Sequence, residues 1–360
     1  MTTRSNVTRR RFLEGAAVLA GAAAGSTLLT AAEAEAAPEV GAASPPAGFK
    51  PLSAPGKIVK VSKGNDFPSL MQKNQLWPKP EVARQMLEKA LTSFTGASTL
   101  AASLAKFIHK DDVVAIKVNG IAGQSGATMA VNFELILPVV EGLIEMGVPA
   151  EKITVYEQFG SYMAGTRIGK KGNVLPAGVK TGVHSNGDAP MKAITVFEKV
   201  KTKYVRFLTQ ATAVIDMTQI KDHSICGYTG CLKNMTHGSI INPQDHHAHH
   251  ASPQIAVLYA HEILQSRVRL HITDGYKIIY DRGPLDKDPK RRIPHGAVYV
   301  ATDPVAMDTI GWQVVEEARK QNGLKTLTQA KREPTYIAKA ADLGVGVHDI
   351  NRIKLKEFAL

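Results

Sequence analysis

The feature that most constrains the fold is a strand–helix–strand succession in the first half of the chain. Residues 112–119 form a continuous apolar run that ends in polar residues, a pattern typical of a buried parallel strand. A helix is predicted from the capping residue Asn132 to Met146, with Gly147 just past its end, and residues 153–156 form the next strand. Two strands joined by a helix make a βαβ unit, so the sequence predicts a parallel sheet.

Similar patterns continue along the rest of the chain. Further strands are predicted at 57–61, 211–216, 268–272 and 297–301, and further helices at 80–94, 98–108, 253–265, 304–320 and 335–343. The sequence thus predicts an α/β domain over residues 57–360, with a mostly parallel sheet, flanking helices and a Gly/Lys-rich excursion at 160–192. Residues 37–56 are rich in Ala, Pro and Gly and are predicted to be a flexible leader.

The N-terminal segment resembles a twin-arginine (Tat) signal peptide. Thr8 precedes Arg9 and Arg10, and two apolar residues follow after one more position. The Ala/Gly/Leu stretch at 15–29 is too short to span a bilayer comfortably, and small residues offer cleavage sites at 32–34 or 34–36. These regions predict a signal peptide over residues 1–36, contact with the Tat translocase during export, and a periplasmic or extracellular location.

The composition favours an anionic partner. The formal net charge is +12, but the Lys and Arg residues are dispersed and aromatic residues make up only 6% of the chain. An exported protein rarely meets nucleic acid, so an anionic small molecule is the expected ligand and nucleic acid is not. No apolar run after the signal peptide is long enough to span a membrane.

Polar residues follow the predicted strands, where ligands bind in open α/β sheets. Asp303 precedes a proline and fits a helix N-cap as well as it fits a site. The strand-end residues are Lys117, Asn119, Glu157, Lys221, His223, Asp274, Asp303 and Asp308.

The segment 221–250 holds the greatest density of such residues. Thr229 lies in a glycine-containing loop that is followed by Lys233 and Asn234. Backbone N–H groups in a loop of this kind can hold an anion while a lysine supplies charge. The spacing is not that of a Walker A motif.

Histidines and cysteines in this segment raise the question of a metal. Imidazole is the commonest protein ligand for transition metals, but a solvated polar loop would have the same composition. The two cysteines are expected to form a disulfide or to stay as free thiols, with metal ligation as the alternative, and alone they cannot supply four thiolates to an iron–sulfur cluster. The candidate metal ligands are His237, His246, His247, His249, His250, Cys226 and Cys231.

The order of the motifs resembles the family DUF362, a domain of unknown function. The matching segments run from about residue 57 to residue 346. Some relatives carry ferredoxin-like cysteine motifs, which implies iron–sulfur chemistry there, but this chain lacks those motifs. The resemblance rests on residues 116–119, 147–157, 221–223, 229–234, 274–275, 283–284 and 303–308.

The sequence favours an exported enzyme that acts on an anionic small molecule, with metal assistance left open. His223, Lys233 and Asp274 are the candidate catalytic residues, with His223 as general acid or base. Asp303 and Asp308 are structural or second metal-binding residues. A metal-binding or redox accessory protein and a non-catalytic anion-binding protein are the alternatives. The candidate anion-binding residues are Lys117, Asn119, Lys221, Thr229, Lys233 and Asn234.

Replacement of both Arg9 and Arg10 by Lys should leave the precursor in the cytoplasm, because the Tat translocase recognises the paired arginines. Cell fractionation against a periplasmic marker measures the outcome. Continued export of the double variant would contradict the Tat assignment.

Overall fold

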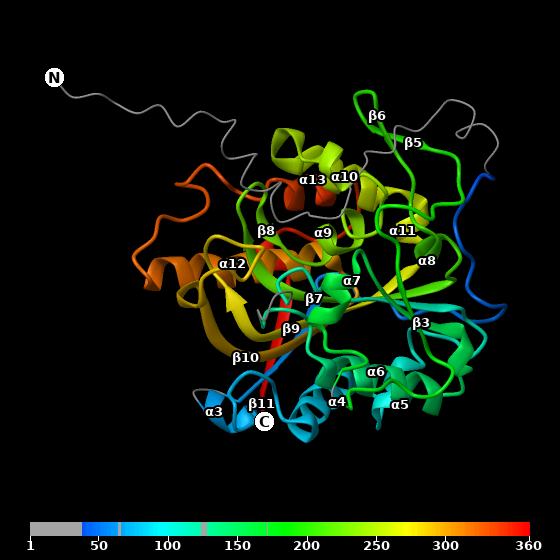
Figure 1. Cartoon of the computed structure of the whole chain (residues 1–360), viewed down its shortest axis with the longest axis horizontal. Helices are drawn as coiled ribbons and strands as arrows, with labels where there is room; N and C mark the ends of the chain where they lie inside the picture. The colour runs from blue at the N-terminus through cyan, green and yellow to red at the C-terminus, as the bar shows by residue number, and fades with distance from the viewer. Residues whose placement is uncertain (1–37, 64–65, 124–127, 171) are drawn as a thin grey trace.

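The computed structural model describes residues 38–63, 66–123, 128–170 and 172–360 (Figure 1). The predicted signal peptide, with Arg9, Arg10 and both cleavage sites, lies outside the described residues. Within the described part of the chain, no helix is long and apolar enough to cross a membrane.

A nine-stranded sheet forms the centre of the molecule, in the order β11-β1-β10-β9-β7-β2-β3-β4, with β8 paired to β7. The pairs from β9 through β7, β2 and β3 to β4 are parallel, whereas β10 runs antiparallel to β9 and β1. The prediction of an α/β fold with a mostly parallel sheet is confirmed. The strands are β1 (Lys57–Ser62), β2 (Val114–Lys117), β3 (Ile153–Glu157), β4 (Lys180–Val183), β7 (Ala213–His223), β8 (Gly227–Thr229), β9 (Val268–Ile279), β10 (Arg292–Ala301) and β11 (Lys354–Ala359), with β5 (Ile194–Phe197) and β6 (Val200–Thr202) in a separate two-stranded sheet.

Helices cover both faces of the sheet (Figure 1). On one face lie α4 (Pro80–Thr95), α5 (Leu100–Leu104) and α6 (Phe133–Glu145), and on the other lie α9 (Cys231–Thr236), α10 (Ser252–Ala260), α12 (Pro304–Gln321) and α13 (Tyr336–Asp342). Because strand side chains alternate, Ile215 of β7 packs into the first layer and Val214 into the second. The shorter helices are α3 (Phe67–Leu70), α7 (Gly160–Gly165), α8 (Arg206–Thr209) and α11 (Glu262–Gln265).

Three local predictions differ from the structure. The helix expected at 98–108 is only Leu100–Leu104, and the carbonyl of Lys106 accepts from the Leu52 N–H instead of a helical partner. The excursion at 160–192 supplies β4, which adds to the sheet beside β3. Asn132 stands at the N-cap of α6 but its side chain makes no cap hydrogen bond there.

The segment 38–56, expected to be a flexible leader, is hydrogen-bonded to the domain at several points. The N–H of Ala43 donates to Ser266 Oγ, and the N–H of Ala54 donates to Thr302 Oγ1, each at 2.9 Å. The Arg267 guanidinium donates to the carbonyl of Gly41 at 3.1 Å. These contacts hold the segment along the surface because its backbone groups find partners on the domain.

Asp303 joins three parts of the fold. Its Oδ1 caps α12 by accepting from the Ala306 N–H, and its Oδ2 accepts from the N–H groups of Gly56 and Val347, all at 2.9 Å. The cap agrees with the Asp-Pro pattern of the sequence, and the carboxylate also ties the start of β1 to the C-terminal region.

Replacement of Asp303 by Ala should lower the free energy of unfolding by about 2–4 kcal/mol, because a helix cap is lost and two further backbone N–H groups lose their partner. Urea denaturation measures the change. The matched control Asp342→Ala alters an exposed carboxylate in α13 and should shift stability by less than about 0.5 kcal/mol. Equal effects in the two variants would contradict this role.

Candidate functional site

A hydrogen-bonded network brings together four of the predicted anion-binding residues at the carboxyl end of β2. The Lys221 ammonium donates to Asn119 Oδ1 at 2.5 Å. The Asn119 and Lys117 side chains both donate to Asn234 Oδ1, at 3.2 and 3.3 Å. These residues come from the end of β2, from β7 and from α9, and their side chains meet in one hydrogen-bonded network.

Lys117 has no donor left for a ligand. Its ammonium forms an ion pair with Glu157 at 3.2 Å and donates to the carbonyl of Val118 at 2.7 Å, in addition to its contact with Asn234. An ammonium has three N–H donors, and three partners occupy them. Lys117 therefore fixes the ends of β2 and β3 against α9.

Lys221 and Lys233 are buried and keep unused donors. Among the described residues, Lys221 donates only to Asn119, and Lys233 contacts only Nε2 of His247, at 3.4 Å. Thr229 faces Lys221 across the β7–β8 pair, and its buried hydroxyl has no partner in the described part of the chain. A buried ammonium or hydroxyl with unused donors is costly unless a ligand or water satisfies it.

Unused acceptors lie on the same side. The amide of Gln219 donates to the carbonyl of Ala130, but its Oε1 has no partner among the described residues, and neither has Oδ1 of Asn132. Gln219 and Lys221 are two residues apart in β7, so their side chains share a face. The region thus offers both donors and acceptors.

His223 presents a fixed tautomer. Its Nδ1 accepts from the backbone N–H groups of Ile225 and Cys226, at 3.1 and 3.3 Å. A ring nitrogen that accepts is unprotonated, so Nε2 carries the proton in the neutral ring. Burial, with the nearby Lys233, lowers the pKa of His223 well below its usual value. At neutral pH His223 is therefore a hydrogen-bond donor through Nε2.

Burial also shifts the pKa of Lys221. Its pKa falls from 10.5 to about 7, mainly because burial disfavours the ammonium, with carboxylates such as Glu157 acting in the opposite direction. Burial likewise lowers the pKa of Lys233. An amine with a pKa near 7 can exchange a proton at neutral pH.

The rings of His237, His246 and His247 lie together, with 4.8 Å between the centroids of His237 and His247 and 6.5 Å between those of His237 and His246, but within the described residues their nitrogens do not form a group of three close ligand atoms. His237 donates through Nε2 to the carbonyl of His246 at 3.1 Å and accepts at Nδ1 from Thr236, so both of its ring nitrogens are used. His246 is buried with both nitrogens unpartnered among the described residues, whereas exposed His249 lies 3.6 Å from Glu198. His247 stacks against His223 with 6.0 Å between ring centroids, and exposed His250 bonds the carbonyl of Ile225 at 3.0 Å.

The remaining predicted residues have structural partners. Asp274 accepts from the backbone and side chain of Asn132, both at 2.8 Å, and from the Tyr276 N–H. Asp308 accepts from the N–H groups of Cys231 and Leu232, and burial raises the pKa of this carboxyl to about 8. Both cysteines are buried free thiols, so the disulfide alternative is wrong in this structure.

Sequence reasoning missed Asp216 and His271, which lie inside strands β7 and β9. Their side chains bond to each other at 2.9 Å, from Oδ2 to Nδ1. Together with Cys231 they place three possible metal-ligand atoms within 4.8 Å of one another. Within the described residues, these three form the group of His, Cys and acidic side chains that could hold a metal ion. The available signal was a polar residue at or next to the end of each predicted strand, at 211–216 and 268–272.

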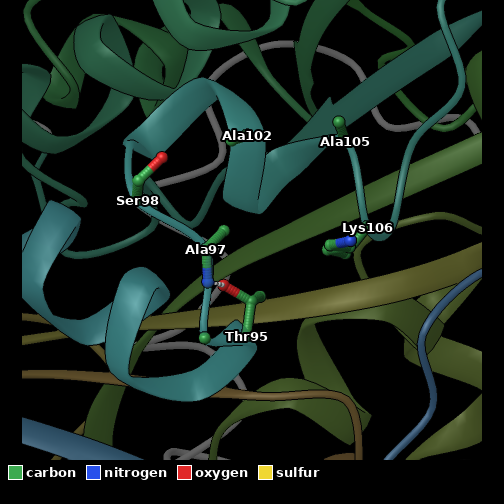
Figure 2. A pocket seen from close by; sticks show the side chains of 7 residues that line it. Thr95, Ala97, Ser98, Ala102, Ala105 and Lys106 are labelled. Atoms are coloured by element: carbon green, nitrogen blue, oxygen red, sulfur yellow. Dashed lines mark hydrogen bonds between the residues drawn. The ribbon is translucent and has the colours of Figure 1, made fainter.

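Hollows elsewhere on the surface carry less chemistry. Figure 2 shows one of about 400 Å³ between the end of α4 and α5, where Thr95 Oγ1 accepts from the Ala97 N–H and Lys106 is the charged lining residue. A second cleft of about 470 Å³ reaches Tyr259 and His271 from the side of segment 51–55.

Comparison with known proteins defines the family but no activity. Residues 114–313 match the domain of unknown function DUF362, which is more than half of the chain, so the chain belongs to this family. No curated protein matches the chain.

Two solved structures are similar to the chain at low sequence identity. The chain is similar to the lactate racemase apoprotein from Thermoanaerobacterium thermosaccharolyticum, with TM-score 0.43, 10% identity, and coverage of 72% of this chain and 57% of that chain. It is also similar to a protein from Thermotoga maritima, with TM-score 0.39, 11% identity, and coverage of 69% and 60%. The chain therefore spans less than two thirds of either structure.

Replacement of Lys221 by Met should change how stability depends on pH. Because the pKa of Lys221 in the folded protein is about 7 rather than 10.5, the folded state binds fewer protons than the unfolded chain between these values, and stability from this residue increases as pH rises through that window. The variant should lack this increase, which amounts to at most about 5 kcal/mol.

Urea denaturation of both proteins at pH 6, 8 and 10 measures the difference. The exposed α12 residue gives a matched control, Lys320→Met, which should retain the wild-type pH dependence. A constant stability difference between wild type and Lys221→Met across this range would contradict the depressed pKa.

Proposed function

We propose that this protein is an enzyme that catalyses proton transfer on an anionic small molecule bound beside Lys221, Lys233 and His223. The observation that carries the proposal is the pair of buried lysines, each with a single polar partner among the described residues. The Lys233 ammonium beside the neutral imidazole donor of His223 forms a local environment suited to a carboxylate or phosphate group, and Lys221 lies two residues from His223 in β7.

The unused acceptors narrow the substrate class. Gln219 Oε1 and Asn132 Oδ1 need hydrogen-bond donors, which a simple anion lacks. A ligand with an anionic group and a hydroxyl or amino group satisfies both kinds of unused atom. We therefore propose a hydroxy- or aminocarboxylate as the substrate class.

The side chains divide the chemical roles. Lys221, with a pKa of about 7, is the group that takes a proton from the substrate as its neutral amine. His223 cannot accept a proton at Nε2 while Nδ1 is held by two backbone N–H groups, so it donates a hydrogen bond to oxygen as negative charge develops there. Lys233 binds the anionic group, and Asp274 positions Asn132.

The place of action is part of the proposal. The twin-arginine motif supports export by the Tat translocase to the periplasm or beyond, and the dispersed positive charge supports a small anionic ligand. A non-catalytic binding protein would use the same lysines, and only a chemical readout separates the two functions.

Exchange of substrate hydrogen with solvent tests the enzyme directly. The mature protein is incubated in D₂O with malate, lactate, serine and aspartate, and ¹H NMR follows loss of the C–H signals. Wild type should exchange the C2 hydrogen of at least one compound, and Lys221→Met should lose about 100-fold or more of that rate because the base is removed. Lys320→Met should exchange at the wild-type rate.

Binding measured in parallel separates the alternatives. Calorimetry should show malate binding more tightly than succinate, which lacks the hydroxyl group, and Lys233→Met should weaken both. Binding by wild type without exchange of any compound would favour the non-catalytic protein. Equal binding of malate and succinate would contradict the assignment of Gln219 and Asn132.

A further inference from the structure

Three buried side chains from three elements converge near the amide nitrogen of Asn234, whose oxygen accepts from Lys117. Asp216 of β7, Cys231 of α9 and His271 of β9 are at most 1% exposed. One oxygen, one sulfur and one nitrogen from them lie within 4.8 Å of one another. Ligand atoms around a tetrahedral ion lie about 3.5 Å apart, so the three atoms need only small side-chain movements to hold one.

The fold fixes this convergence. Asp216 and His271 are direct partners in the parallel β7–β9 pair, so their side chains leave the same face of the sheet. Cys231 is the first residue of α9, which packs on β7. Its position is held by the Asp308 carboxylate, which accepts from the Cys231 N–H at 2.6 Å.

Both oxygen and nitrogen ligands are braced from behind. The second oxygen of Asp216 accepts from Asn234 Nδ2 at 2.7 Å. The second nitrogen of His271 lies 3.2 Å from the hydroxyl of Tyr259. Metal-bound histidines and carboxylates have outer partners of this kind, which orient the ligand atoms.

Hydroxyl groups lie beside the three ligands. Thr218 and Thr273 are the next partners along the same face of β7 and β9, two residues beyond Asp216 and His271. Both hydroxyls are buried; that of Thr218 has no hydrogen-bond partner in the part of the chain that the structure describes, and that of Thr273 lies beside the Cys231 thiol. A bound ion with a coordinated water would supply a partner for the Thr218 hydroxyl.

We propose that Asp216, Cys231 and His271 bind a divalent transition-metal ion, with zinc as the best match. A mixed thiolate, imidazole and carboxylate set suits zinc and cobalt, whereas magnesium and calcium prefer oxygen alone. A cleft of about 470 Å³ reaches one of the three ligands, His271, and its outer partner Tyr259 from the surface. This site is separate from Lys221 and does not depend on the proposed activity.

Cobalt binding tests the site without any assay of turnover. Metal-free protein, purified without a histidine tag, is titrated with Co²⁺. Wild type should bind one equivalent and develop a thiolate-to-cobalt charge-transfer absorption band. Loss of an outer partner alone weakens metal binding 10–100-fold, so Cys231→Ser and His271→Gln should each weaken zinc binding by more than about 100-fold.

Matched variants separate this site from other metal-binding groups. Cys226→Ser removes the other buried thiol and should keep the absorption band. Replacement of His246, His247, His249 and His250 by Ala together should also keep it. Retention of the band in Cys231→Ser, or its loss in the four-histidine variant, would overturn the proposal.

X-ray absorption of zinc-loaded wild type needs no variant and therefore does not depend on how the variants fold. The expected first shell has one sulfur at about 2.3 Å and nitrogen or oxygen atoms at about 2.0–2.1 Å. A shell of nitrogen and oxygen alone, or failure of the wild-type protein to bind zinc or cobalt, would contradict the site.

Discussion

The side-chain amide of Asn234 is the contact on which both buried polar regions depend. Its oxygen accepts from Lys117 and Asn119, and its nitrogen donates to Asp216. An amide has donors at one end and an acceptor at the other, so it can link a cationic group to a carboxylate without carrying charge itself. Asn234 thereby holds α9 between the lysines at the carboxyl end of β2 and the carboxylate within β7.

Burial of charge divides the lysines into two kinds. Lys117 is paired with Glu157 and fully hydrogen-bonded, so its charge is compensated within the protein. Lys221 has no ion pair within hydrogen-bonding distance in the described part of the chain, and its pKa falls to about 7. A lysine with a purely structural role is expected to be ion-paired, as Lys117 is, because an uncompensated buried charge destabilises the fold. The second arrangement is typical of groups that bind or react.

The sequence predicted the parallel sheet and its polar edge because both follow from local patterns. An apolar run that ends in Lys117 and Asn119 identifies a buried strand and its polar end, and Asp-Pro identifies the cap formed by Asp303. Asp216 and His271 escaped notice because their partnership exists only through the pairing of β7 with β9, which sequence spacing does not encode. Likewise, the spacing of histidines in the sequence does not determine where their side chains point. His246 is buried, whereas His249 is exposed.

Helix α9 contributes residues to both buried polar regions, which are suited to ligands of opposite charge. The region around Lys221 and Lys233 has unused hydrogen-bond donors and is suited to an anion. The region around Asp216 contains a carboxylate and a thiol and is suited to a cation. Helix α9 contributes Lys233 and Asn234 to the first and Cys231 to the second, so a ligand on either side stabilises the position of the same six residues. A ligand that binds only the folded state adds its binding free energy to stability. Ligand binding in the two regions therefore offsets the cost of burying these charges. It also stabilises the short helix α9 that lies between them.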